Sequence, residues 1–255
     1  MVMPENAAFF VDDVCIPHSW YTIEPGVNDR FYVYITDVPA YPNATPTLGY
    51  IAVLESRVYT GTDLAAEIQT ALNGIPLTQA NPFTASYSAT THKISISTTA
   101  NDLAFKVLTG EDLKSQMDGA WPGPTYNTAK PDDINSPMLK QSEGASSLYQ
   151  LGAPWISGVL SLQPIRSLYL YSPTLGNFET IGPNGERSIL KAIPVTAGPN
   201  YMIFDNTMAG NDYLDCSRQS LRTLEFQLKD VHGNLVNFHG SNLSFSLIFD
   251  VLPEK

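Results

Sequence analysis

Residues 243–251, LSFSLIFDV, alternate apolar and polar side chains with one exception. Leucine, phenylalanine and valine occupy the odd positions, while Ser244, Ser246 and Asp250 occupy three of the even ones. Because successive side chains of a β-strand point to opposite faces, this pattern predicts a strand with one buried face and one solvated face. Such strands are typical of antiparallel sheets, so the stretch favours an antiparallel β protein.

Segments with the same character recur on both sides of the chain. They are short, rich in β-branched and aromatic residues, and separated by turn signals such as Pro183-Asn184-Gly185. These segments lie at residues 9–23, 31–35, 159–162, 168–171, 189–195, 201–204, 224–228 and 235–238. Many short strands with turn residues between them predict a mainly β fold, an antiparallel sandwich or jelly roll.

One part of the chain has a different pattern. Within residues 63–73, Leu64, Ile68 and Leu72 recur at helical spacing, and Gly74 is suited to end the helix. A short apolar strand precedes this helix, and a hairpin of alternating residues follows it. The order of elements predicts a small β-α-β-β unit.

We therefore expect two parts in the chain. Residues 50–109 form the inserted β-α-β-β subdomain, while residues 1–49 and 110–255 together form the sandwich domain. The first part of the second segment, residues 110–154, is rich in proline and glycine and is expected to be a long loop or extended crossing.

The composition excludes several classes of protein. The 255 residues are 43% hydrophobic and only 15% charged, with a net charge of -11, so a disordered chain is excluded. The acidic balance argues against a nucleic-acid backbone as the main partner, and no apolar run is long enough for a membrane span. Low charge leaves much surface to be covered by uncharged polar residues or by other protein.

Few residues suggest chemistry. Cys216 with His232 or His239 is conceivable as a nucleophile and base, and the two histidines as metal ligands. Neighbouring aspartates are conceivable calcium ligands, but the patterned calcium loop is absent. A buried thiol, turn histidines and solvated carboxylates are the simpler interpretations. We predict that the protein is not an enzyme and has no cofactor or metal.

Four residues are candidates for contact with another subunit. Trp121 and Trp155 lie in or beside the proline-rich segment, and tryptophan is a frequent interface anchor. Arg218 and Arg222 suit bidentate pairing with carboxylates, of which the chain has a surplus. Packing in the core is the alternative for the tryptophans, and pairing within the chain is the alternative for the arginines.

Two sets of motifs carry a resemblance to a known family. The first is YTG at residues 59–61 ahead of LAAEIQTALN at 64–73. The second is TIGPNGER at 180–187, followed by DYLDC at 212–216 and LRTLEF at 221–226. Together they resemble the penton, or minor capsid, proteins of virophages, Polintons and Polinton-like viruses, over roughly residues 50–250.

The resemblance implies a single jelly roll and no catalytic residues. It also implies a homopentamer at each vertex of an icosahedral capsid, surrounded by capsomers of a double-jelly-roll major capsid protein. The inserted unit at 50–109 would project outward as a tower, and the protein would be made inside the host cell and reside in the virion. The alternative function is a carbohydrate- or receptor-binding β-sandwich of a virion spike. A glycosidase is a third interpretation with little sequence support.

Overall fold

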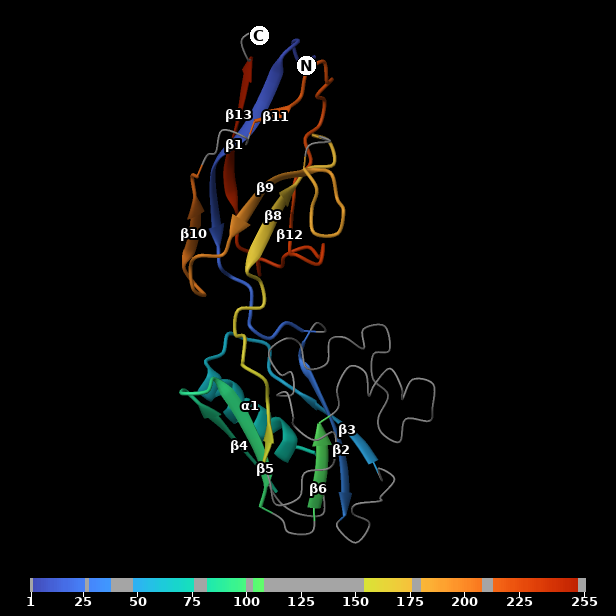
Figure 1. Ribbon diagram of the computed structural model, residues 1–255, viewed down its shortest axis with the longest axis vertical. Helices are drawn as coiled ribbons and strands as arrows, with labels where there is room; N and C mark the ends of the chain where they lie inside the picture. Colours follow the sequence, from blue (N-terminus) through green and yellow to red (C-terminus); the bar gives the residue numbers. More distant parts are fainter. Residues whose placement is uncertain are drawn as a thin grey trace. The chain divides into compact units, whose positions relative to one another are not determined.

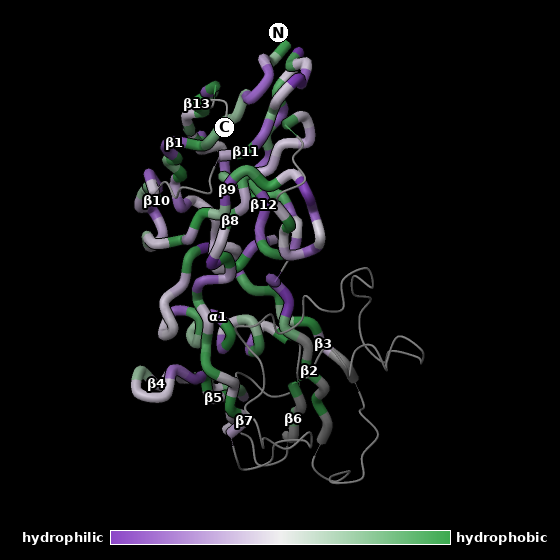
Figure 2. Tube along the Cα trace, turned by 45° about the horizontal axis from the view of Figure 1, so that its top comes forward, coloured by the Kyte–Doolittle hydropathy of each residue, from purple (hydrophilic) through white to green (hydrophobic). Residues whose placement is uncertain are grey.

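The computed structural model describes most of the chain (Figure 1). The described residues are 2–25, 28–37, 48–75, 82–99, 103–107, 154–175, 180–207 and 213–251. The chain divides into two compact units: unit 1 contains Met1–Trp20 and Ile165–Lys255, and unit 2 contains Tyr21–Pro164. Hydrophobic segments are found in both units (Figure 2).

Unit 1 is organised around a long central strand, β1 (Ala7–Pro17). Strand β13 (Ser244–Val251) pairs along most of β1, so the two partners β10 (Met202–Asp205) and β11 (Leu214–Asp215) lie on the opposite edge. All three pairings are antiparallel. The register with β13 skips between Val11 and Val14, which marks a β-bulge in β1.

A second sheet of unit 1 has the order β12-β8-β9 and is also antiparallel. Its strands are β8 (Ser167–Tyr171), β9 (Ile189–Pro194) and β12 (Gln227–Lys229). Leu168 and Leu170 of this sheet share one hydrophobic core with Phe9 and Ile16 of β1. The two sheets of unit 1 therefore pack as a sandwich with alternate side chains inward.

A polar contact joins the two sheets at the β1 bulge. The ammonium group of Lys191 on β9 lies 3.7 Å from a carboxylate oxygen of Asp205 on β10. The same group donates to the carbonyl oxygens of Thr207, at 2.9 Å, and Val11, at 3.4 Å. Both side chains of the pair are 10% exposed, so the contact is almost fully enclosed.

Unit 2 consists of two three-stranded antiparallel sheets and a helix. One sheet has the order β3-β2-β6 and the other β4-β5-β7. The elements are β2 (Arg30–Asp37), β3 (Leu48–Val53), α1 (Gly61–Asn73), β4 (Phe83–Ser88), β5 (Lys93–Thr98), β6 (Leu103–Val107) and β7 (Trp155–Ile156). Helix α1 buries Leu64, Ile68 and Leu72 in the core that both sheets share.

The helix begins and ends where its sequence dictates. Thr60 is the N-cap residue, and its hydroxyl accepts the backbone N–H of Asp63 at 3.2 Å. Gly74 follows the last turn and donates its N–H to the carbonyl of Thr70 at 3.0 Å. Within the described part of the chain, no helix combines the length and apolarity needed to cross a membrane.

The predicted fold class is confirmed: the chain is mainly β, with antiparallel sheets and a β-α-β-β succession in β3, α1, β4 and β5. The unit boundaries differ from the expected segments 1–49, 50–109 and 110–255. The chain divides instead after Trp20 and after Pro164. The physical reason is strand pairing, because β2 pairs with β3 and β6, and β7 pairs with β5.

Candidate interaction surface

The distinctive motif at residues 180–187 forms a closed turn in unit 1. The backbone N–H of Gly182 donates to the carbonyl of Glu186 at 2.7 Å, and that of Gly185 donates back to the carbonyl of Gly182 at 3.0 Å. Gly185 has φ +83, a conformation that side chains disfavour, so glycine is required there. The Glu186 carboxylate accepts the N–H of Asn184 at 3.0 Å, which fixes the tip of the turn.

A second turn, at residues 230–234, contacts the first. The Asp230 carboxylate accepts the backbone N–H groups of His232, at 2.8 Å, and Asn234, at 2.9 Å. The side-chain amide of Asn184 crosses from the first turn and donates to the carbonyl of Val231 at 3.2 Å. The two turns thus form one hydrogen-bonded assembly, here named the paired turns (residues 180–187 and 230–234).

The paired turns combine internal order with exposed aliphatic side chains. Ile181 on the first turn and Leu235 just after the second are among the most exposed large hydrophobic residues of unit 1, and Val231 on the second turn is also exposed. Hydrogen bonds from its own backbone and from Asn184 lower the pKa of Glu186, so its carboxylate stays charged and bonded. A fixed backbone with exposed aliphatic groups suits contact with another protein.

The two arginines suggested by the sequence have different surroundings. The guanidinium of Arg218 lies 2.6 Å from the Glu5 carboxylate in an ion pair whose side chains are both more than 70% exposed. This is the intrachain pairing that the sequence left open. Arg222 is exposed, and among the described residues it forms no ion pair. Of the two arginines, Arg222 is therefore the one whose charge is available to a partner.

The two tryptophans do not form a common surface in the described structure. Trp155 on β7 is 3% exposed and packs edge-on against Phe31, with ring centroids 6.3 Å apart. Among the described residues, its indole N–H has no hydrogen-bond partner. Its position corresponds to the core-packing alternative, which leaves almost no ring surface for a neighbouring subunit. Trp121 lies outside the described residues.

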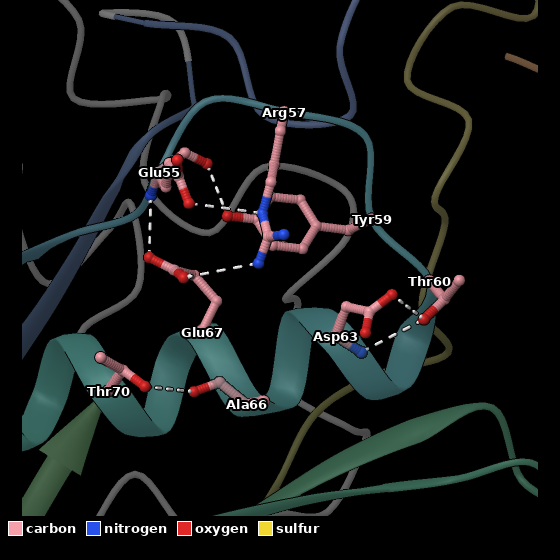
Figure 3. Close-up of polar contacts among 8 residues, drawn as sticks. All are labelled: Glu55, Arg57, Tyr59, Thr60, Asp63, Ala66, Glu67 and Thr70. Atoms are coloured by element: carbon pink, nitrogen blue, oxygen red, sulfur yellow. Dashed lines mark hydrogen bonds and ion pairs between the residues drawn. The ribbon is translucent and has the colours of Figure 1, made fainter. Parts of the chain in front are cut away.

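A cluster of charged residues in unit 2 fixes the segment between β3 and α1 (Figure 3). The Arg57 guanidinium lies 3.5 Å from Glu55, 3.9 Å from Glu67 and 4.6 Å above the ring of Tyr59. The Tyr59 hydroxyl donates to the carbonyl of Glu55 at 2.6 Å. Burial raises the pKa of Tyr59, so this hydroxyl remains a donor at neutral pH. These contacts hold the start of the helix in place.

Cys216, the residue considered as a nucleophile, does not have the surroundings of a reactive thiol. Cys216 is fully buried, and burial, followed by the neighbouring Asp215 carboxylate, raises the pKa of its thiol. A nucleophilic cysteine needs the opposite shift. Within the described ranges, no group of three histidine, cysteine or acidic residues lies close enough to hold a metal ion.

Comparison with known proteins gives a similarity to a solved structure. No family model matches the chain, and no curated protein is detectably similar in sequence. Among solved structures, the crystal structure of the mavirus penton protein superposes with a TM-score of 0.53 and 12% identity. The match covers 97% of this chain and 86% of that one. The fold is similar to that of a penton protein.

The predicted resemblance to penton proteins is thereby confirmed at the level of the fold. The motif that carried the resemblance most distinctly, residues 180–187, forms the first of the paired turns. Sequence reasoning did not identify Ile181, Val231 or Leu235 as exposed. Apolar residues beside glycine and asparagine in a turn were the signal that could have indicated them.

Proposed function

We propose that the protein is a structural minor capsid protein, a penton, which forms the vertices of an icosahedral virus shell as a homopentamer. The observation that carries this proposal is the fold similarity to the mavirus penton protein over 97% of the chain. The role is structural and not catalytic, which agrees with a buried Cys216 thiol of raised pKa.

The proposed particle has a definite arrangement around the vertex. The sandwich of unit 1 serves as a single jelly roll, and capsomers of a double-jelly-roll major capsid protein surround the pentamer. Residues 50–109, which belong to unit 2, project outward as a tower. The protein is made inside the host cell and ends in the virion.

The composition supports an assembly role. Charged residues are 15% of the chain, against roughly 25% in a typical globular protein. Interface centres are depleted of charge, so a subunit with several neighbours is expected to carry less of it. The net charge of -11 keeps free subunits apart and soluble before assembly.

A cryo-electron map of the particle that contains this protein tests the proposal. We expect five copies around each fivefold axis. Copies found only as trimers, or at twofold edges, would contradict a penton role and indicate another minor capsid function. Copies found only on a separate spike, with binding on a glycan array, would support the alternative of a carbohydrate- or receptor-binding module.

A further inference from the structure

The outer face of the four-stranded sheet in unit 1 carries an apolar strip. Phe204 on β10 lies opposite Cys15 on β1, and Phe10 on β1 lies opposite Ile248 on β13. Met202 occupies the same face of β10 as Phe204. Met202 and Phe204 are more than half exposed and Ile248 is 40% exposed, whereas Cys15 is partly exposed and Phe10 is 7% exposed, so the exposed area of the strip is formed mainly by Met202, Phe204 and Ile248. We name these five residues the apolar strip.

The apolar strip departs from the rule for a sheet with one solvated face. Such a sheet places polar side chains outward, and Ser244, Ser246 and Asp250 on β13 follow that rule. On β10, and at Phe10 and Cys15 of β1, the outward side chains are instead apolar or aromatic, while Asp12 in the β1 bulge is exposed and charged. Phe10 also contacts the ring of Tyr213, with centroids 4.9 Å apart. An apolar area that continues over neighbouring strands marks a contact surface.

Negative charge lies at one end of this face. Ala8 of β1 lies between Asp215 on β11 and Asp250 on β13, so two exposed carboxylates flank the same backbone position. A partner that brings a positive charge to this end would be attracted to both carboxylates.

The outer face of the other sheet has the complementary character. Tyr169 and Tyr171 point outward from its central strand, β8, beside Ala192 of β9. The ammonium group of Lys229 on β12 lies 4.1 Å from the centre of the Tyr171 ring. Within the three strands of this sheet, the charged residue on the outer face is this lysine, and there is no carboxylate.

We propose that the apolar strip of one copy docks on the outer face of the β12-β8-β9 sheet of a second copy of this chain. Apolar side chains then cover the two tyrosines, and Asp215 and Asp250 approach Lys229. The two surfaces are different, so the contact is heterologous and repeats around a closed ring. This inference rests on the proposed homopentamer and identifies the surfaces through which it closes.

A cysteine crosslinking experiment tests the contact in the full chain. Cys15 lies in the strip, and Ala192→Cys places a second thiol on the opposite face. Under oxidation of the concentrated protein, we expect Ala192→Cys to give a ladder of covalent dimers, trimers and larger rings. We expect at least tenfold more of these products than with Ser241→Cys, an exposed control site that lies outside the strands of both sheets.

Two further variants define how the result is interpreted. Phe204→Ser in the Ala192→Cys chain should reduce the ladder at least tenfold without changing the circular dichroism melt. Cys15→Ser in the same chain should abolish it. Dimers that form through Cys15 alone would mean that the strip pairs with itself, and would overturn the proposal. Equal crosslinking at Ala192→Cys and Ser241→Cys, or none at either, would also overturn it.

The penton proposal and the sheet-to-sheet contact are tested by different experiments. If the particle map places five copies at the vertex but no ladder forms, only the assignment of the two sheet faces is wrong. If the ladder forms but the protein is absent from the fivefold axes, the sheet-to-sheet contact stands and the penton role is wrong.

Discussion

Replacing Lys191 by methionine removes the contact that joins the two sheets of unit 1 at the β1 bulge. Lys191→Met loses the ion pair with Asp205 and the two hydrogen bonds to the carbonyl oxygens of Thr207 and Val11. Methionine retains a similar length and fills much of the same space. The variant therefore tests mainly the polar contacts and not the packing.

The expected cost follows from the burial of the pair. Removing one partner of a buried ion pair costs about 3–5 kcal/mol, and a hydrogen bond to a charged group contributes about 1.5–3 kcal/mol. Two features reduce the figure here: the side chains are 10% exposed, and Asp205 keeps the N–H of Thr207 at 2.8 Å. We expect a loss of about 2–3 kcal/mol in the free energy of unfolding, at or just below the lower end of the range for buried pairs.

Urea unfolding of the full chain measures this loss. With a typical denaturant slope, the midpoint of the transition should fall by about 1 M. Hydrogen exchange should locate the effect in β1 and β10, while β2 keeps its protection. The matched control is Arg222→Met, which removes one exposed positive charge and should cost less than about 0.5 kcal/mol.

A double variant separates the pair from its parts. Lys191→Met with Asp205→Asn should be more stable than the sum of the single changes predicts, by about 1–2 kcal/mol, because no unpaired carboxylate remains enclosed. If Lys191→Met costs no more than Arg222→Met, or the two single changes are additive, the reasoning about the enclosed pair is refuted.

Three smaller changes test other parts of the structure. Gly61→Ala should cost about 1–3 kcal/mol through overpacking, since a Cβ would lie 2.5 Å from the Tyr87 ring; thermal melts should show no such cost in a Tyr87→Ala background. Thr60→Ala should cost about 1 kcal/mol by loss of the helix cap, whereas Thr60→Ser should be nearly neutral in the same melts. Hydrogen bonds from Ser217 lower the pKa of Asp215 in the folded protein. The ionised Asp215 carboxylate therefore stabilises the fold at pH values above its unfolded pKa, and this stabilisation is lost as the pH falls through its lower folded pKa. Urea midpoints from pH 6 to pH 2.5 should therefore fall less for Asp215→Asn than for the unchanged chain, and equal falls would contradict this.

Local patterns determined much of what the sequence could predict. The alternation in residues 243–251 predicted a strand, and β13 is Ser244–Val251. The helix was expected at residues 63–73 and is found at Gly61–Asn73, because its cap and its apolar stripe are both local signals. Residues 159–162 were expected to form a strand and do not, because apolar content alone does not provide a partner strand.

Such local patterns could not predict which strands pair when they are far apart in the sequence. Nothing in Trp155–Ile156 indicates that it pairs with β5, some sixty positions earlier in the chain. That one pairing transfers Trp155 from a candidate interface to the core of unit 2. Arg218 was likewise a candidate for a partner's carboxylate, and its pairing with Glu5 depends on the pairing of β1 with β11, which brings the two segments together.

Several charged side chains of unit 1 form contacts within the chain, and this links the low charge of the sequence to the proposed assembly. The Asp230 and Glu186 carboxylates are held by hydrogen bonds within the paired turns, and Lys191 joins Asp205 between the sheets. With few charges in the chain and several of them engaged in these internal contacts, the outward positions of β1 and β10 in the apolar strip carry none. An exposed apolar area on a sheet face favours contact with another surface. Low charge therefore has a specific consequence: it leaves one face of the sandwich suited to a neighbouring copy.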